Sequence, residues 1–496
     1  MRLAAQKISP TVMVLVVALT AATVWIVPVE FIPYWLGGIG GVAGFAAYVV
    51  LGDPLVAVLA WFVSLTCLHE EFARLILPGF FNLTIPRVFI VVLAIGLAAM
   101  VAAGRIRIRW ARQAAVPMGL ILIYFTVSAA VSGFRTASII TVHYRLISGY
   151  WFAFLAFFLL VQFIRTDVDI RRILIFFFVL GLYLTFTGWA EQFKLWSLVW
   201  PRFIADPTKG IHWGRVRGPF LMSMEMGLVL VFAFYGNLVL ARMSGTGLCW
   251  TARFACLAML PVIFWTQTRS VWLAMLVGGA LWLGWSRRGL TRIVSLSLVV
   301  AVLVVGAAVN WRRIVSPQRE VGGVTALEPI HVRVGLLMIT WDMFKDRPVF
   351  GVGFGHFRDY APRYATDPAS PYHRFAALAV QHSNFLSILS ECGLVGLVLY
   401  VWLLVALFRA SVRVYRRLPP TGAEPINRDL VVLYWILFVS YLIHAAFIET
   451  SHAVISNPLF FGLSAIVFAL DYALGPYPLP EPRSDEAKPP PVPIRA

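Results

Sequence analysis

Charged side chains are scarce in this sequence. Only 13% of the 496 residues are Asp, Glu, Lys or Arg, whereas 60% are hydrophobic and the mean hydropathy is +0.82. Soluble domains carry about 25% charged residues, and their interiors are too small to bury this much apolar surface. The composition excludes a soluble enzyme, a secreted disulfide scaffold and a disordered chain, and it predicts an all-α polytopic membrane protein. A membrane β-barrel is disfavoured, because the apolar runs are continuous rather than alternating.

Cysteine is also scarce, with four residues and no Cys-x-x-Cys pair. Cys67, Cys249, Cys256 and Cys392 are therefore expected to be thiols, most of them buried, rather than disulfides or metal ligands. The basic N-terminus leads into an apolar run without a small-residue cleavage site, which predicts a retained first helix.

Apolar segments of membrane-crossing length recur along the chain. About fourteen spans are predicted, and twelve or thirteen if some shorter segments do not cross the bilayer. The segments are 11–29, 31–51, 54–68, 86–103, 116–133, 147–164, 173–190, 219–241, 254–268, 270–286, 292–309, 384–408, 429–448 and 455–472.

Acidic residues are few relative to basic ones, 23 against 41, so the net charge is +18. In membrane proteins, Lys and Arg concentrate in short cytoplasmic loops, which explains this charge without nucleic acid. The densest basic short loops follow even-numbered segments, although odd-numbered loops also carry Arg74, Arg87, Arg135 and Arg145. The pattern predicts a multi-pass membrane protein with both termini in the cytoplasm.

This topology divides the chain into four parts. Residues 1–309 would hold eleven spans, 310–383 a large periplasmic loop of short helices, 384–472 the last three spans, and 473–496 a Pro-rich disordered tail in the cytoplasm. The basic residues of the large loop are Arg312, Arg313, Arg319, Arg333, Lys345, Arg347, Arg358, Arg363 and Arg374. Such a surface suits an anionic, phosphate-rich ligand, but a merely solvated basic loop is the alternative.

Two motifs lie inside the large loop. Residues 331–344 have helical apolar spacing (Val332, Leu336, Ile339, Met343), which predicts a helix along the membrane surface. The run Gly-Val-Gly-Phe-Gly at 351–355 lacks the strand and helix of a dinucleotide site, so its glycines are expected to form a tight turn.

The run Thr266-Gln267-Thr268-Arg269 separates two short apolar segments. Arg269 is 16 residues from Arg253, or about 24 Å along a helix, which places it near the outer edge of the roughly 30 Å hydrocarbon core. A charge there needs a partner or a polar cavity. An arginine that reaches to lipid phosphates is an equally good interpretation.

Two further arginines precede the eighth span. Arg215 and Arg217, beside His212 and Trp213, are suited to a phosphate group at the membrane surface, although an interfacial anchor would look the same. Glu225 follows inside the span, where a carboxylate usually pairs with a cation; Arg217 or Arg269 is the expected partner.

The third polar run, Gln381-His382-Ser383-Asn384, enters the twelfth span. A neutral His can accept a proton near pH 7, although a lone His at a helix start is more often structural. The topology, which rests on the charges of the short loops alone, places His382 on the same face as Arg215, Arg217 and Arg269.

These runs together resemble the O-antigen ligase superfamily, which also includes polysaccharide polymerases and protein O-oligosaccharyltransferases. The resemblance covers about 215–400, and Thr268 stands where the family usually has Ser. The motifs that carry it are Thr266-Gln267-Thr268-Arg269, Asp346-Arg347-Pro348 with the glycine run, and His382-Ser383 followed by Gly393-Leu394-Val395-Gly396.

The resemblance implies a metal-independent glycosyltransferase without a cofactor. It would move a glycan from undecaprenyl pyrophosphate to a hydroxyl of lipid A core, of a growing glycan or of a protein, on the periplasmic face of the bacterial inner membrane. His382 would be the general base, Arg269 with Arg215 or Arg217 would bind the pyrophosphate, and Glu225 and Thr268 would support them.

Two alternatives stay open. The first is a polymerase of the same superfamily, and the second is a flippase for a lipid-linked anion, although no pair of related halves is evident. Acidic residues outside the motifs form no convincing metal site. Asp167 and Asp169 are expected to be solvated, and Asp342 and Asp346 could share a helix face but are flanked by Lys345 and Arg347. His69 with Glu70 and Glu71 is expected to be a solvated loop, with a cation site or acid–base chemistry as the alternative.

Overall fold

The computed structural model describes most of the chain. The described residues are 44–46, 48–49, 52–68, 72, 74–75, 83–138, 140–286, 289, 291, 328–367, 370–377, 379–420 and 426–475. The predicted spans 11–29 and 292–309, most of 31–51, the start of the large loop and nearly all of the tail lie outside these ranges.

Nine described helices are long and apolar enough to cross a membrane, and they coincide with predicted segments. They are α4 (Ile85–Ala102), α5 (Arg112–Ser132), the continuous helix of α6 (Val142–Leu146), η1 (Ile147–Trp151) and α7 (Phe152–Phe163), α8 (Asp167–Gln192), α9 (Ser223–Arg242), α10 (Thr246–Trp265), α17 (Asn384–Arg417), α18 (Arg428–Phe447) and α19 (Ser456–Ala473). The predicted all-α polytopic membrane fold is therefore confirmed.

Two other described helices match predicted segments, α3 (Pro54–Cys67) and α11 (Arg269–Ser286). Extended structure in the described residues is a small antiparallel hairpin of β1 (Arg74–Leu75) and β2 (Leu83–Thr84). The four cysteines are free thiols, and all but Cys249 are buried, as predicted.

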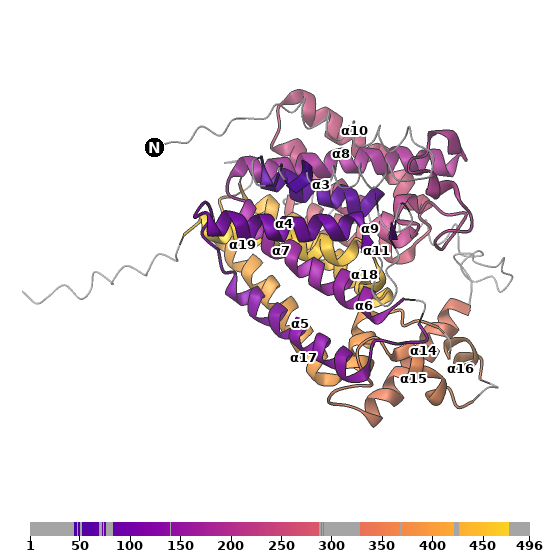
Figure 1. Ribbon diagram of the computed structural model, residues 1–496. Coiled ribbons are helices and arrows are strands. Elements are labelled where there is room, and N and C mark those ends of the chain that lie inside the picture. Colours follow the sequence, from indigo (N-terminus) through magenta and orange to yellow (C-terminus); the bar gives the residue numbers. More distant parts are fainter. Residues whose placement is uncertain are drawn as a thin grey trace, which may run out of the picture.

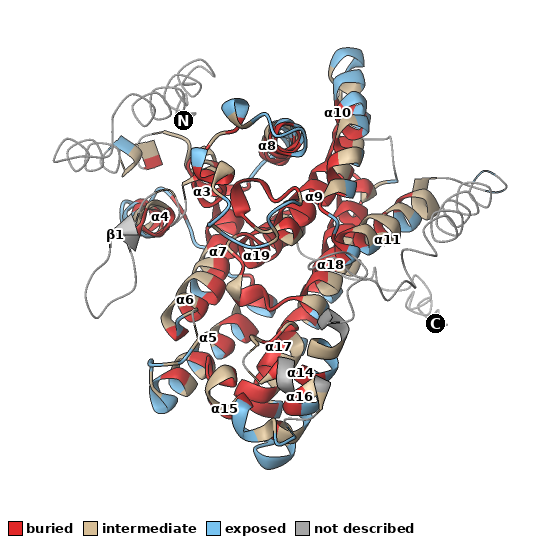
Figure 2. Ribbon diagram, turned by 90° about the vertical axis from the view of Figure 1, so that its right-hand side faces the viewer, coloured by how far each residue is buried: buried red, intermediate tan, exposed pale blue. Residues whose placement is uncertain are grey.

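The centre of the bundle is formed by α7, α9, α18 and α19, whose residues are mostly buried (Figure 2). Helices α5 and α10 expose much more of their surface, because their apolar residues face outward. Helix α5 packs lengthwise against α17 (Figure 1). Apolar exposure of this kind is expected of helices that face lipid.

One end of the bundle gathers the basic short loops. Arg172 pairs with Asp53 at 2.8 Å, and Arg242 pairs with Asp429 at 3.0 Å. Asp53 also caps α3, and Asp169 completes a capping box with Thr166 at the start of α8. These contacts join described basic loops at one end of the bundle, whereas the full topology and the end that faces the cytoplasm stay predictions.

Helix α17 consists of two pieces, because Gly393 interrupts it with φ +62° and ψ −160°. The glycine turn at 351–355 lies against this break. The backbone N–H groups of Val352 and Gly353 donate to the carbonyls of Ser390 and Glu391 at 2.9 and 2.8 Å. The turn thus satisfies backbone groups that the broken helix leaves unpaired.

Only glycine fits this joint. A Cβ at Gly351 would lie 2.4 Å from the backbone of Glu391, and a Cβ at Gly393 would lie 2.3 Å from the carbonyl of Val349. The glycine turn at 351–355 has φ values of +71°, +113° and +87° at its three glycines, so the predicted tight turn is confirmed.

The described part of the large loop is a small helical unit at the other end of the bundle, made of α14 (Glu328–Asp346), α15 (Phe357–Tyr364) and α16 (Pro371–Ala376) (Figure 1). The predicted helix is present as α14, and its position along the membrane surface stays a prediction. Leu336, Ile339 and Met343 pack on α15 and α16, with Val332 partly buried beside them. The apolar stripe that stays exposed lies on another face of α14, at Val334, Leu337, Met338 and Trp341.

Candidate active site

Three polar segments meet at the same end of the bundle as the α14 unit. They are the loop 211–218 before α9, the turn 266–269 between α10 and α11, and the run 381–383 before α17. The N–H of Val216 donates to the carbonyl of Trp265 at 3.2 Å, which joins the first segment to the second. The predicted site residues therefore converge from distant parts of the sequence.

Arg217 is fully buried and holds its own loop together. Its guanidinium donates to the carbonyls of Ile204 and Asp206 at 3.2 and 2.9 Å, and also to the carbonyl of Lys209. Glu191, at the end of α8, lies 3.6 Å from Nε of Arg217 and accepts from its backbone N–H at 3.0 Å. These contacts fix the loop from the inside.

Arg269 has the opposite environment. It is exposed at the first position of α11, and its guanidinium makes no hydrogen bond or ion pair within the described chain. The turn before it is tight, because Gln267 adopts φ +47° and Thr268 Oγ1 donates to the carbonyl of Thr266 at 2.9 Å. The turn thus presents a fixed backbone with an available cation at its end.

A chain of hydrogen bonds links the first two segments. Ser223 Oγ lies 3.1 Å from Thr268 Oγ1 and 3.2 Å from Nδ1 of His212. Since Thr268 gives its proton to Thr266, Ser223 must give its own to Thr268, and Nδ1 of a neutral His212 must then be the donor to Ser223. The Nε2 atom of His212 is left with its lone pair.

The segment around His382 is positioned by its neighbours. Gln381 is buried and donates to Thr340 Oγ1 of α14 at 2.7 Å, while its own Oε1 accepts the backbone N–H of His382 at 2.8 Å. The Ser383 hydroxyl caps α17. The imidazole of His382 has no hydrogen-bond partner among the described residues, so both ring nitrogens are available to a substrate.

The charged groups of the three segments lie close enough to shift one another's pKa values. Burial and the neighbouring Arg269 lower the pKa of Arg215, and the same two causes lower that of Arg333 on α14. Burial and Arg333 lower the pKa of His382. Burial, Arg215 and His382 lower the pKa of His212 to about 4. The site therefore combines three cationic guanidiniums with two imidazoles that are neutral at pH 7.

The structure does not support the predicted partner of Glu225. Its carboxylate is fully buried in the first turn of α9, where it accepts from the Ser456 hydroxyl at 2.5 Å and from the backbone N–H of Ile455 at 3.0 Å. These groups lie at the start of α19, where the first N–H groups of a helix have no partner within the helix. They donate to the Glu225 carboxylate in place of the expected arginine. Glu225 thus joins α9 to α19 behind the site.

A buried ion network lies behind His382. Arg145 makes a bidentate pair with Glu391 of α17 at 2.7 and 2.6 Å, and it also pairs with Glu449 in the turn before η5 (Thr450–His452). Glu449 in turn lies 3.2 Å from Nε2 of His452, whose pKa burial lowers strongly. The network fixes the first piece of α17, which begins two residues after His382.

Several of these residues were missed by sequence reasoning. Arg333 was one of nine basic residues in the large loop, and no pattern distinguished it from the others. Glu391, which directly precedes Cys392-Gly393 in an apolar run, was a usable signal, because a carboxylate at such a position requires a partner. Its partner Arg145 lies 246 positions away and could not be assigned without the fold.

The described residues contain no group of three or more His, Cys, Asp or Glu side chains that could hold a metal ion. Lys345 pairs with Asp342 at 2.8 Å, which leaves that acidic position on α14 as an ordinary surface ion pair. His69, Glu70 and Glu71 lie outside the described residues.

Comparison with known families bears directly on this site. Residues 254–401 match the model of the family described as O-Antigen ligase, which confirms the resemblance over that part of the chain. The match spans α10 to the middle of α17 and includes Arg269, Arg333 and His382, whereas the loop with Arg215 precedes it. No curated protein matches the chain.

Proposed function

We propose that this membrane protein is a glycosyltransferase of the O-antigen ligase type, which moves a glycan from undecaprenyl pyrophosphate to an acceptor hydroxyl on the periplasmic face. The family match supports an enzyme of the ligase or polymerase type. The observation that carries the specific proposal is the juxtaposition of Arg215, Arg269 and Arg333 with the available imidazole of His382.

The arginines would bind the pyrophosphate of the donor. Guanidinium groups form paired hydrogen bonds with phosphate oxygens, and a fixed cluster stabilises the charge that develops as the pyrophosphate leaves. Arg269 is suited to this contact because its charge is available, and Arg215 and Arg333 lie beside it. Three guanidiniums in one place would supply the charge that a divalent cation supplies in many phosphate sites, so we propose a metal-independent reaction.

His382 would be the general base. The acceptor oxygen attacks the anomeric carbon, the bond from that carbon to the phosphate oxygen breaks, and the hydroxyl proton moves to the imidazole. The lipid pyrophosphate departs with the bonding electrons and one additional negative charge. A displacement in a single step inverts the anomeric configuration, as in other glycosyl transfers assisted by a base.

Arg217 has a different role in this proposal from Arg215. Its guanidinium is engaged by three carbonyls and by Glu191, so it would shape the loop that presents Arg215 and His212. Thr268 supports the same loop through Ser223. Glu225 would support the site from below, by holding α9 against α19.

The test is transfer by the purified full-length protein in nanodiscs, with undecaprenyl-pyrophosphate-linked glycan and separate acceptors: lipid A core, free glycan and peptide. We expect Arg269→Ala to reduce transfer by at least 10²–10³-fold, and Arg135→Ala, an exposed arginine at the same end, to leave it unchanged. The acceptor that is consumed distinguishes ligase from polymerase. A different outcome would favour a flippase. In that case the protein would bind the donor and move it across the membrane of liposomes, but it would not transfer the glycan to any of the acceptors.

A further inference from the structure

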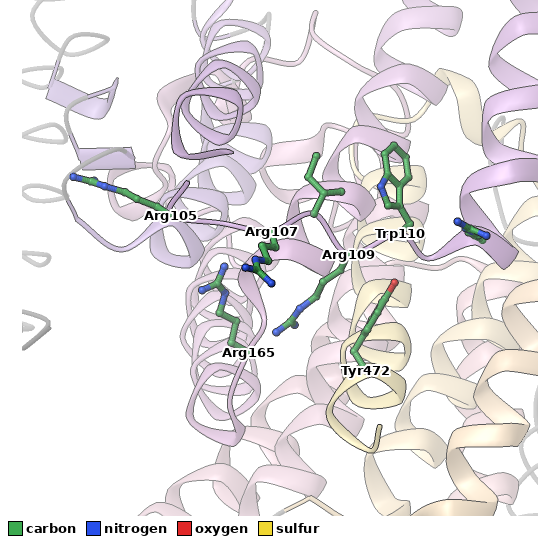
Figure 3. Close-up of a pocket in the computed structure, with 8 residues that line it drawn as sticks. Arg105, Arg107, Arg109, Trp110, Arg165 and Tyr472 are labelled. Carbon is green, nitrogen blue, oxygen red and sulfur yellow. The ribbon is translucent and has the colours of Figure 1, made fainter. Parts of the chain in front are cut away.

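The opposite end of the bundle contains a hollow of about 560 Å³ that is lined mainly by arginines. Its position is set by the connection from α4 to α5, which runs without helical structure from residue 106 to residue 111. Figure 3 shows Arg107, Arg109 and Arg165 close together, with Tyr472 beside Arg109, whereas Arg105 extends to one side. The full lining is Arg105, Arg107, Ile108, Arg109, Trp110, Arg112, Arg165 and Tyr472.

The connection is held in place by a buried amide. Gln162 of α7 is fully buried; its Oε1 accepts the N–H of Arg109 at 2.8 Å, and its Nε2 donates to the carbonyl of Arg109 at 3.1 Å. The Arg109 guanidinium donates to the carbonyl of Ile164 at 3.0 Å. A loop that is basic only for membrane orientation needs no such clamp, so the hollow is a built feature of the fold.

The lining of the hollow contains five arginines and no carboxylate. Asp169 and Asp471, which are close in sequence to lining residues, have other partners: Asp169 caps α8, and Asp471 pairs with Arg413 and Arg417 at 3.1 and 3.0 Å. Burial and the proximity of Arg165 lower the pKa of Arg109. The fold thus holds like charges together, which is unfavourable unless an anion joins them.

We propose that this hollow, the arginine recess, binds the phosphate headgroup of an anionic membrane lipid, and that a headgroup with two phosphates binds best. Basic pockets between membrane helices on the side of the basic loops suit such headgroups. The volume and the number of guanidiniums exceed what a single phosphate requires.

The surroundings favour a lipid over a free anion. Trp110 and Tyr472 stand at the edge of the recess with 58% and 41% of their surface exposed, as is typical of aromatic residues at a lipid–water boundary. Arg112 begins the same face of α5 that continues as Val116, Leu120 and Ile123, all exposed. A headgroup in the recess would therefore have its acyl chains against this apolar stripe.

The test measures lipid binding rather than glycan transfer, so it is independent of the proposed function. The thermal midpoint of the detergent-solubilised full-length protein is followed against added diphosphatidylglycerol, phosphatidylethanolamine or inorganic diphosphate. Arg107→Gln with Arg165→Gln removes two charges from the recess. Arg409→Gln with Arg416→Gln is the matched control, because both arginines are exposed on α17 at the same end, outside the recess.

We expect diphosphatidylglycerol to raise the midpoint of the wild type and of the control variant. The apparent affinity should fall roughly 20-fold in the recess variant, since each arginine contributes a severalfold effect near an anionic headgroup. Equal stabilisation of both double variants, or equal stabilisation by phosphatidylethanolamine, would overturn the proposal. Protection by inorganic diphosphate as strong as that by the lipid would overturn the assignment to a lipid.

Discussion

Arg217 and Arg269 lie at the same end of the molecule, and both were expected to bind pyrophosphate, yet their surroundings are opposite. Arg217 is 0% exposed and surrounded by carbonyls and Glu191, whereas Arg269 is exposed and has no described partner. The guanidinium of Arg217 forms its hydrogen bonds within its own loop, whereas that of Arg269 is available to a ligand. Equal charge in neighbouring motifs therefore does not mean equal function.

The largest effect on the chemical step is expected at His382, the other group without a hydrogen-bond partner among the described residues. His382→Ala should lose about 10²–10⁴-fold in transfer rate, the usual contribution of a positioned base, while donor affinity persists because the arginines remain. Rate and donor affinity are measured on the same folded protein. His143→Ala, a histidine elsewhere at this end, is the control. An undiminished rate would show that His382 is not the base and would direct attention to Nε2 of His212.

Arg269→Ala should reduce transfer by at least 10²–10³-fold, the range found when one preorganised electrostatic contact is removed. Arg269→Lys should rescue poorly, because an ammonium cannot replace a planar pair of donors. Yield and thermal midpoint should stay at wild-type values. Wild-type turnover in Arg269→Ala would leave only the interpretation that Arg269 reaches to lipid phosphates.

Arg217→Ala is expected to reduce stability rather than donor binding. It leaves Glu191 buried without its cation and three carbonyls without a donor, a change that typically costs on the order of 3–5 kcal/mol. We expect a lower yield and a lower thermal midpoint. Glu191→Gln in the same background should recover part of the midpoint, since it removes the isolated charge. If Arg217→Ala folds normally and loses only donor affinity, Arg217 is a ligand contact after all.

A smaller effect is expected on pH dependence. The pKa of His382 lies below its ordinary value of about 6.5, so the imidazole is neutral at pH 7 and activity should fall only on stronger acidification. Arg333→Gln removes a neighbouring positive charge, and the pKa of His382 should rise. The acid limb of the rate profile should then move to higher pH, whereas Arg333→Lys should leave it in place. An unmoved limb in Arg333→Gln would separate Arg333 from His382.

No effect is expected from metal removal. Transfer in excess EDTA should equal that in added magnesium, because in the proposed reaction the guanidinium cluster would neutralise the leaving group. A loss with EDTA that magnesium or manganese restores would show that the arginines alone do not suffice. It would make His69, Glu70 and Glu71 the next residues to substitute.

Sequence alone was sufficient for features that depend on local pattern. The positions of the helices followed from hydropathy, and the glycine turn followed from three glycines in five residues. Partners at long range were not predictable. Glu225 finds Ser456 at a separation of 231 residues, and Arg217 finds Glu191 at a separation of 26. An apolar run determines that a polar residue needs a partner, but only the packing of the helices determines which one.

The break in α17 has a consequence for the glycans that such a protein can use. Ser383 and Gly393 are ten residues apart along α17, so at 1.5 Å per residue the start of the helix beside His382 stands about 15 Å along the axis from the joint with the glycine turn. This distance along α17 is set by the backbone and is the same for every donor. The arginines are suited to the pyrophosphate, and the base is suited to the bond beside it. Sugars beyond the first would therefore extend past these groups without being recognised by them. If the proposed function holds, donors with short and long glycans should be accepted alike.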